Sequence, residues 1–177
     1  LVSELFGHRV GAFTDATRQH QGWLERAGDG TLVLDRIEAL PLGGQTALLR
    51  ALEERAFFPV GTTAARPFRA RVVALADAGL RNRMGAGLFR SDLYHRLAGY
   101  HAQLLPLRRR PEDIVPFARA VLRRSTRKVG RKLVLDGDAE RLLAAYPWPG
   151  NFRELETVLS RAVVQANGPE IGPADLG

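Results

Sequence analysis

Two short apolar runs, separated by the pattern of an amphipathic helix, limit the fold of this chain more than any other feature. The runs are residues 31–34, which are followed by Asp35, and residues 72–75. Such runs are typical of buried parallel strands. Residues 45–55, which lie between them, carry leucines at helical spacing with charges in between. Strands separated by helices predict an α/β layer with a parallel sheet.

Weaker patterns complete this part of the chain. Residues 57–60 and 67–69 flank a Gly-Thr-Thr segment and are predicted to form a hairpin. Residues 88–97 are predicted to form a helix. Residues 100–105 are the weakest strand candidate.

After Pro106 the pattern becomes helical. The predicted helices cover residues 113–128, 138–145 and 151–166, with prolines near their starts. Asp136 or Asp138 can cap the second of them. We therefore predict an α/β part at residues 1–106 and a small helical part at residues 107–177.

The composition excludes some classes of protein and leaves one question open. Cysteine is absent, which excludes disulfides and thiolate metal sites. Without a long apolar run or a signal-peptide pattern, we expect no membrane span and a cytoplasmic location. The net charge is +7, and of 26 basic residues only Lys128 and Lys132 are lysines. This balance suits a polyanionic partner, but a coding bias toward arginine explains it as well.

Asp35 is the first candidate for chemistry. A carboxylate at the C-terminal end of a buried parallel strand lies where α/β sheets bind ligands. In phosphate-handling sheets it holds Mg²⁺ directly or through water. Many strands also end in Asp simply because a turn begins there.

The segment Gly11, Ala12, Phe13, Thr14, Asp15 and Ala16 is the second candidate. An aromatic ring and a hydroxyl between small residues suit a contact loop, because small neighbours let a partner approach closely. The alternative is a turn in which Phe13 is buried.

Three arginines are further candidates. Arg90 and Arg96 lie in the segment 89–97, and arginines at a subunit edge can neutralise phosphate charge on a neighbour. Most such pairs simply lie on a solvated helix face. Arg153 lies in the first helical turn after Asn151, a potential cap, where a cation opposes the helix dipole. An anionic ligand or a structural salt bridge explains that placement.

The chain resembles the central AAA+ domain of sigma-54-dependent enhancer-binding activators over essentially its whole length. The matching segments, in order, are residues 3–7, 30–35, 89–97, 107–114 and 148–155. The resemblance implies part of a parallel α/β ATPase core followed by a helical lid. Such proteins form rings, commonly hexamers, bind ATP with Mg²⁺ between subunits and remodel sigma-54 RNA polymerase. They bind DNA through a separate helix-turn-helix domain.

The resemblance also implies roles for single residues. Asp35 looks like the Walker B magnesium ligand, and Arg153 like the nucleotide-sensing lid arginine. Arg90 and Arg96 look like arginine fingers offered to a neighbour's ATP. Residues 11–16 match the loop that touches the sigma factor, with Phe13 and Thr14 as its contact residues. The turn between residues 60 and 68 resembles the second loop, which supports the first.

The sequence departs from the family at the nucleotide site. The phosphate-binding Gly-x-x-x-x-Gly-Lys-Ser/Thr loop would precede Leu1 and is not in the sequence, which favours a fragment of a longer protein. Arg36 stands where the family has a Glu that polarises the attacking water, and arginine cannot accept a proton. Glu38 would point the same way only if the strand continued.

Two further departures carry charge. Asp77 replaces a sensor Asn and would repel the γ-phosphate unless compensated, so we expect an Arg36–Asp77 pair. Asp15 replaces a Gly of the contact loop, which costs stability if that position needs a positive φ.

Three functions remain open. The first is an ATP-driven activator of sigma-54 polymerase. The second is a non-hydrolysing pseudo-ATPase module that oligomerises and regulates transcription through partner contacts, favoured by Arg36, Asp77 and Asp15. The third, least favoured, is direct nucleic-acid binding through a basic face. That face would comprise Arg119, Arg123, Arg124, Arg127, Lys128 and Arg131.

Overall fold

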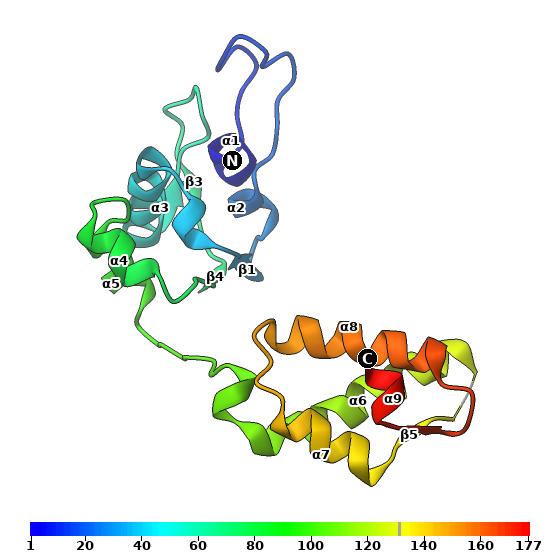
Figure 1. Ribbon diagram of the computed structural model, residues 1–177. Coiled ribbons are helices and arrows are strands. Elements are labelled where there is room, and N and C mark those ends of the chain that lie inside the picture. Colours follow the sequence, from blue (N-terminus) through cyan, green and yellow to red (C-terminus); the bar gives the residue numbers. More distant parts are fainter. Residues whose placement is uncertain (131) are drawn as a thin grey trace. The chain divides into compact units, whose positions relative to one another are not determined.

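The computed structural model describes residues 1–130 and 132–177, apart from the side chains of Lys128 and Val129. The chain divides into two compact units, Leu1–His101 and Ala102–Gly177, each with its own apolar core (Figure 1). In the described residues, no helix is both long enough and apolar enough to cross a membrane.

The first unit mixes short strands and helices. Its elements are α1 (Val2–Phe6), α2 (Trp23–Arg26), β1 (Thr31–Leu34), the 3-10 turn η1 (Ile37–Ala39), α3 (Leu42–Glu54), β2 (Ala56–Phe57), β3 (Arg66–Pro67), β4 (Arg71–Ala74), α4 (Leu80–Gly85) and α5 (Ser91–Leu97). Large side chains from these elements form its core, among them Phe6, Leu24, Leu48, Phe57, Phe68, Phe89 and Leu93.

The predicted parallel pair is confirmed. Strands β1 and β4 pair in parallel from Thr31 opposite Arg71 to Leu34 opposite Ala74. Two backbone hydrogen bonds extend the pairing, from Leu75 N to Leu34 O (2.8 Å) and from Ile37 N to Leu75 O (3.0 Å). Helix α3 lies in the connection between the two strands and buries its leucine face in the core, as its spacing predicts.

The predicted hairpin is also present, with shorter strands. Strands β2 and β3 pair antiparallel, and Phe68 N donates to Arg55 O at 2.7 Å. The strand candidate at residues 100–105 is wrong. These residues form no strand, and the side chains of Tyr100 and Leu104 are 89% and 83% exposed. Apolar residues indicate a strand only where a surface exists to cover them.

The second unit is mainly helical. Its elements are the 3-10 turn η2 (Leu107–Arg109), α6 (Pro111–Val129), β5 (Val134–Leu135), α7 (Gly137–Ala145), α8 (Asn151–Gln165), β6 (Glu170–Ile171) and α9 (Pro173–Leu176). Helix α6 packs against both α7 and α8, and the parallel pair β5–β6 was not predicted. Trp148 is buried in this core, and its ring nitrogen donates to Leu143 O at 2.8 Å.

A side-chain cap fixes the start of α7 but not that of α8. Of the two candidates for α7, Asp136 is the cap, because its Oδ1 accepts from Ala139 N at 2.6 Å. The prediction that Asn151 caps α8 is wrong. Its side-chain oxygen instead accepts from Leu107 N at 2.9 Å, and Glu154 accepts from Gly150 N.

Two backbone segments of the first unit cross so closely that only glycine fits. A Cβ on Gly22 would lie 2.2 Å from Gly7 N and 2.4 Å from Phe6 C. Gly7 has φ 78°, and a Cβ there would lie 2.6 Å from His20 O. This crossing closes the long loop between residues 7 and 22.

We expect Gly22→Ala to lower the free energy of unfolding by about 2 kcal/mol or more, because backbone atoms must move to admit the methyl group. Urea unfolding followed by circular dichroism measures the change.

Gly43→Ala is the matched control, since a Cβ at Gly43 in α3 meets nothing within 4 Å. It should be neutral or raise the free energy of unfolding by up to about 1 kcal/mol. Equal stability of the two variants would contradict the crossing.

Candidate functional site

Asp35 and Asp77 follow the C-terminal ends of the two paired strands. The bond from Ile37 N to Leu75 O continues the β1–β4 pairing past both strand ends. Because β1 and β4 are parallel, the segments that carry the two carboxylates leave the sheet at the same edge. Both side chains are exposed. We call this edge the carboxyl edge.

Asp35 can offer a cation a single carboxylate. Within residues 1–130 and 132–177, no three His, Cys, Asp or Glu side chains gather closely enough to hold a metal ion. Mg²⁺ commonly takes one or two carboxylates and completes its shell with water and phosphate oxygens. The carboxyl edge therefore suits a cation that arrives with a phosphate ligand.

Arg36 occupies the turn directly after Asp35. It is exposed and has φ 51° and ψ 58°, in the left-handed region. The strand ends at Leu34 and η1 starts at Ile37, so the alternation that would bring Glu38 beside Asp35 is broken. Glu38 is only 6% exposed, and its Oε2 has no hydrogen-bond partner. It does not replace the missing carboxylate at the carboxyl edge.

The expected Arg36–Asp77 ion pair is not formed, although the structure describes both residues. The side chain of Asp77 instead turns back on its own loop, where Oδ1 accepts from Gly79 N at 2.7 Å. Asp77 therefore acts first as a turn residue, because aspartate readily bonds an amide two residues on.

An open hollow of about 660 Å³ lies along β1 and includes Asp35 and Arg36 in its lining. Its walls are largely apolar, with Val33 of the strand 56% exposed. Trp23 lies there beneath Arg26, whose guanidinium carbon is 4.4 Å from the ring centroid. The hollow can take an apolar group next to Asp35.

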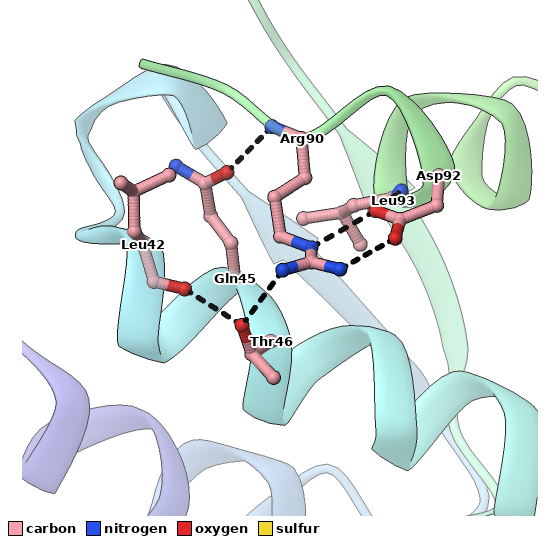
Figure 2. A network of polar contacts seen from close by, with 6 residues as sticks. All are labelled: Leu42, Gln45, Thr46, Arg90, Asp92 and Leu93. Atoms are coloured by element: carbon pink, nitrogen blue, oxygen red, sulfur yellow. Dashed lines mark hydrogen bonds and ion pairs between the residues drawn. The ribbon is translucent and has the colours of Figure 1, made fainter. Parts of the chain in front are cut away.

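Arg90 is held by a network within the first unit (Figure 2). Its Nε donates to Asp92 Oδ1 at 3.0 Å and its Nη2 to Asp92 Oδ2 at 2.6 Å, a bidentate pair. Nη1 lies 3.4 Å from Thr46 Oγ1 of α3. The hydrogen bonds and the charge of Arg90 hold the pKa of Asp92 below its ordinary value, and Asp92 raises the pKa of Arg90.

Arg96 lies in a different place. Its Nη2 donates to Leu52 O at 3.0 Å, near the end of α3. It lines a hollow of about 540 Å³ together with Arg55, Arg69, Arg71 and Asp29. Because Arg71 begins β4, this hollow lies at the amino end of the strand pair, opposite the carboxyl edge. The structure does not bring Arg96 and Asp35 together within one chain.

Residues 11–16, the contact loop, form a closed turn with its aromatic residue half exposed. Gly11 N donates to Ala16 O and Ala16 N to Phe13 O, each at 2.9 Å. Phe13 is 45% exposed, whereas Ala16 is buried and Thr14 is exposed. The alternative of a fully buried Phe13 is therefore wrong.

Asp15 fits the contact loop without backbone strain. The concern that its position needs a positive φ is wrong, because Asp15 is not among the non-glycine residues of positive φ in the described part of the chain. Its side chain is exposed, and it adds a negative charge to the loop.

Two histidines that sequence reasoning missed form the stem of the contact loop. His8 and His20 exchange backbone hydrogen bonds, both 3.0 Å long, and their rings stack with centroids 5.5 Å apart. The His8 ring also contacts Phe13 at 4.8 Å, and its Nδ1 lies 2.6 Å from Ser3 Oγ. Their symmetric places on either side of residues 11–16 could have suggested a stem.

The second loop touches the first, as the resemblance implies. Arg9 N donates to Val60 O at 3.1 Å, and Val60 N donates to Gly7 O at 2.9 Å. A Cβ on Gly61 would lie 2.7 Å from the Cβ of Ala12. The turn after Val60 therefore supports the base of the contact loop.

In the second unit, Arg153 is exposed in the first turn of α8. Its side chain has no hydrogen-bond or ion-pair partner among the described residues, so the structural salt bridge is not formed. The basic face of α6 is partly neutralised. Arg119 pairs with Glu140 and Arg124 with Glu156, while the Lys128 side chain and Arg131 lie outside the described residues.

Comparison with known proteins identifies both units. Residues 1–103 match the family model of the Sigma-54 interaction domain, and residues 108–177 match the AAA+ ATPase lid domain. Regulatory protein AtoC of Escherichia coli (strain K12) is 44% identical over 177 residues, which cover 99% of this chain and 38% of AtoC. Sigma54-dependent transcriptional activator SfnR of Pseudomonas putida is 43% identical, over 98% of this chain and 48% of SfnR.

The chain spans 38% and 48% of the length of these two curated relatives. Crystal structures of NtrX from Brucella abortus share the fold. One has a TM-score of 0.84 at 31% identity and covers 100% of this chain and 41% of that one. Another, in complex with ATP, has a TM-score of 0.85 at 29% identity and covers 99% and 39%. This chain belongs to the Sigma-54 interaction domain family of bacterial transcriptional regulators and carries its AAA+ lid.

Proposed function

We propose that this chain is the AAA+ module of a ring-forming transcriptional regulator, which binds ATP between subunits and contacts sigma-54 RNA polymerase. The observation that carries the proposal is the contact loop. It presents Phe13 half exposed on a stem that is held by the crossing of Gly7 and Gly22 and by contacts with the second loop. An exposed aromatic residue on a rigid support keeps much of its contact area for a partner at low entropic cost.

The separation of the charged groups supports a nucleotide site that two subunits share. Asp35 lies at the carboxyl edge, whereas Arg96 lies at the opposite end of the strand pair. One chain therefore cannot apply both groups to the same phosphate. In a ring, Asp35 of one subunit would hold Mg²⁺ on ATP, while Arg90 and Arg96 of the next would reach the phosphates. Arg153 of the lid, which has no partner among the described residues, would sense the nucleotide.

The bound Mg²⁺ would neutralise phosphate charge, but hydrolysis also needs a group that orients the attacking water. Arg36 has no lone pair to accept a proton. Glu38, the next carboxylate along the chain, is buried in η1. We infer that hydrolysis is slow. The lack of a carboxylate that could orient water favours the second candidate function, a non-hydrolysing module that oligomerises and regulates transcription through partner contacts.

The remaining parts of the proposal follow from this role. Contact with RNA polymerase implies a cytoplasmic site of action, and promoter DNA would be bound through a separate helix-turn-helix domain. The NtrX structures solved with ADP and ATP support nucleotide binding by this fold. A hexamer is the ring size that we propose.

Restoring a carboxylate next to Asp35 tests the chemistry. In the complete gene product, we expect Arg36→Glu to raise the ATP turnover number at least about tenfold, because a positioned general base contributes typically 10²–10⁴-fold. A phosphate-release assay at saturating ATP measures the turnover.

Arg36→Gln is the control, since it removes the positive charge without supplying a base. It should leave turnover near that of the unchanged protein. Fast turnover by the unchanged protein would show that another group orients the water.

The contact loop is tested by its affinity for sigma-54 holoenzyme in the presence of ATP. We expect Phe13→Ala to weaken binding at least about tenfold, as truncation of a central aromatic contact does. Val10→Ala is the control, because Val10 is 63% exposed and lies just outside the loop. Equal losses of affinity in the two variants would contradict the assignment of Phe13 as a sigma-factor contact.

A further inference from the structure

Gln45 of α3 is a fully buried polar residue, and none of the roles described so far uses it. Its side chain is 0% exposed, in the apolar core of the first unit. Nε2 donates to Leu40 O at 2.7 Å and to Leu88 O at 3.1 Å, and Oε1 accepts from Arg90 N at 2.9 Å. A buried amide survives in a core only when its polar atoms are paired, and here both N–H groups and the oxygen are used.

These partners fix the orientation of the amide. Two of them are carbonyl oxygens and one is an N–H. Exchanging Oε1 and Nε2 would therefore place an acceptor against each carbonyl oxygen and a donor against the Arg90 N–H. The side chain thus has one arrangement, with its oxygen on Arg90. Figure 2 shows the Gln45 side chain reaching from α3 to the backbone at the start of α5.

The contacts join two segments that are far apart in the sequence. Leu40 ends the segment that begins at Asp35, and Leu88 and Arg90 belong to the segment that leads into α5. Thr46, the next residue of α3, lies 3.4 Å from the Arg90 guanidinium. One turn of α3 therefore contacts both the backbone and the side chain of Arg90.

We infer that Gln45 is a positioning residue. Its hydrogen bonds fix the backbone of Arg90 and connect it to the segment that follows Asp35. Because Asp92 orients the guanidinium and Gln45 holds the backbone, Arg90 is presented from a fixed point. The inference rests on the proposed function only in taking Arg90 to act on a neighbour's nucleotide.

Hydrogen exchange in the complete gene product tests the structural part. Gln45→Met fills a similar volume but offers Arg90 N no acceptor of comparable strength. We expect the Arg90 amide to exchange at least about tenfold faster, since an unpaired buried group loses the energy of its bond. Protection of the amides of Leu48 and Leu49 should be retained.

Thr46→Val is the matched control on the same helix turn, and it should leave the Arg90 amide unchanged. If Gln45→Met does not fold, Gln45→Leu serves in its place. Its side chain is of similar size and also offers Arg90 N no acceptor. There too we expect faster exchange at residues 88–90 only. Unchanged exchange at Arg90, or a general loss of protection, overturns the inference.

Turnover tests the functional part, in the Arg36→Glu background. Gln45→Met should lower kcat about tenfold with KM for ATP unchanged, the loss expected for an interaction made only in the transition state. Adding it to Arg90→Ala should cause no further loss, because both changes remove the same group's action. Additive losses, or a rise in KM alone, contradict the positioning role.

The two readouts separate the inference from the proposed function. If Arg90→Ala leaves kcat unchanged, or no background shows turnover, the finger role of Arg90 fails. Faster amide exchange confined to residues 88–90 in Gln45→Met would then still show that Gln45 positions the backbone of Arg90.

Discussion

The parallel pairing of β1 with β4 is the constraint on which the first unit depends. It aligns Leu34 with Ala74, and the bonds through Leu75 and Ile37 carry the alignment beyond the strands. As a consequence, the segments bearing Asp35 and Asp77 leave the sheet at one edge, while Arg71 and Arg96 lie at the other end. Helix α3, which must connect parallel strands, is thereby placed to hold Arg90 through Gln45 and Thr46.

This geometry divides the charged groups in a way that suits assembly. A carboxylate for a cation and a cation for a phosphate lie on different parts of one unit, so a nucleotide that uses both needs two copies. The Arg90 guanidinium, meanwhile, is already bonded to Asp92. Binding a phosphate therefore exchanges one anion for another at Arg90. This exchange limits the net gain in binding free energy and favours a ligand with two or more negative charges.

Most of the fold followed from local patterns, because the signals were strong where elements are buried. The apolar runs at residues 31–34 and 72–75 and the leucines of α3 predicted the parallel layer, with strand bounds within one residue of those observed. Residues 100–105 failed, since apolar character alone does not show that a covering surface exists. Asn151 failed as a cap because a distant amide, Leu107 N, took its oxygen. Gln45 could not be found, since two of its three partners, Leu88 and Arg90, lie far along the chain.

A mixing experiment tests the central claim, that Asp35 and Arg96 of different subunits act on one ATP. Both variants are made in the Arg36→Glu background of the complete gene product, one with Asp35→Asn and one with Arg96→Ala. Each alone should be nearly inactive. Their mixture should hydrolyse ATP, because some interfaces pair the intact Asp35 of one subunit with the intact Arg96 of the next. A mixture no more active than its components would contradict the shared site.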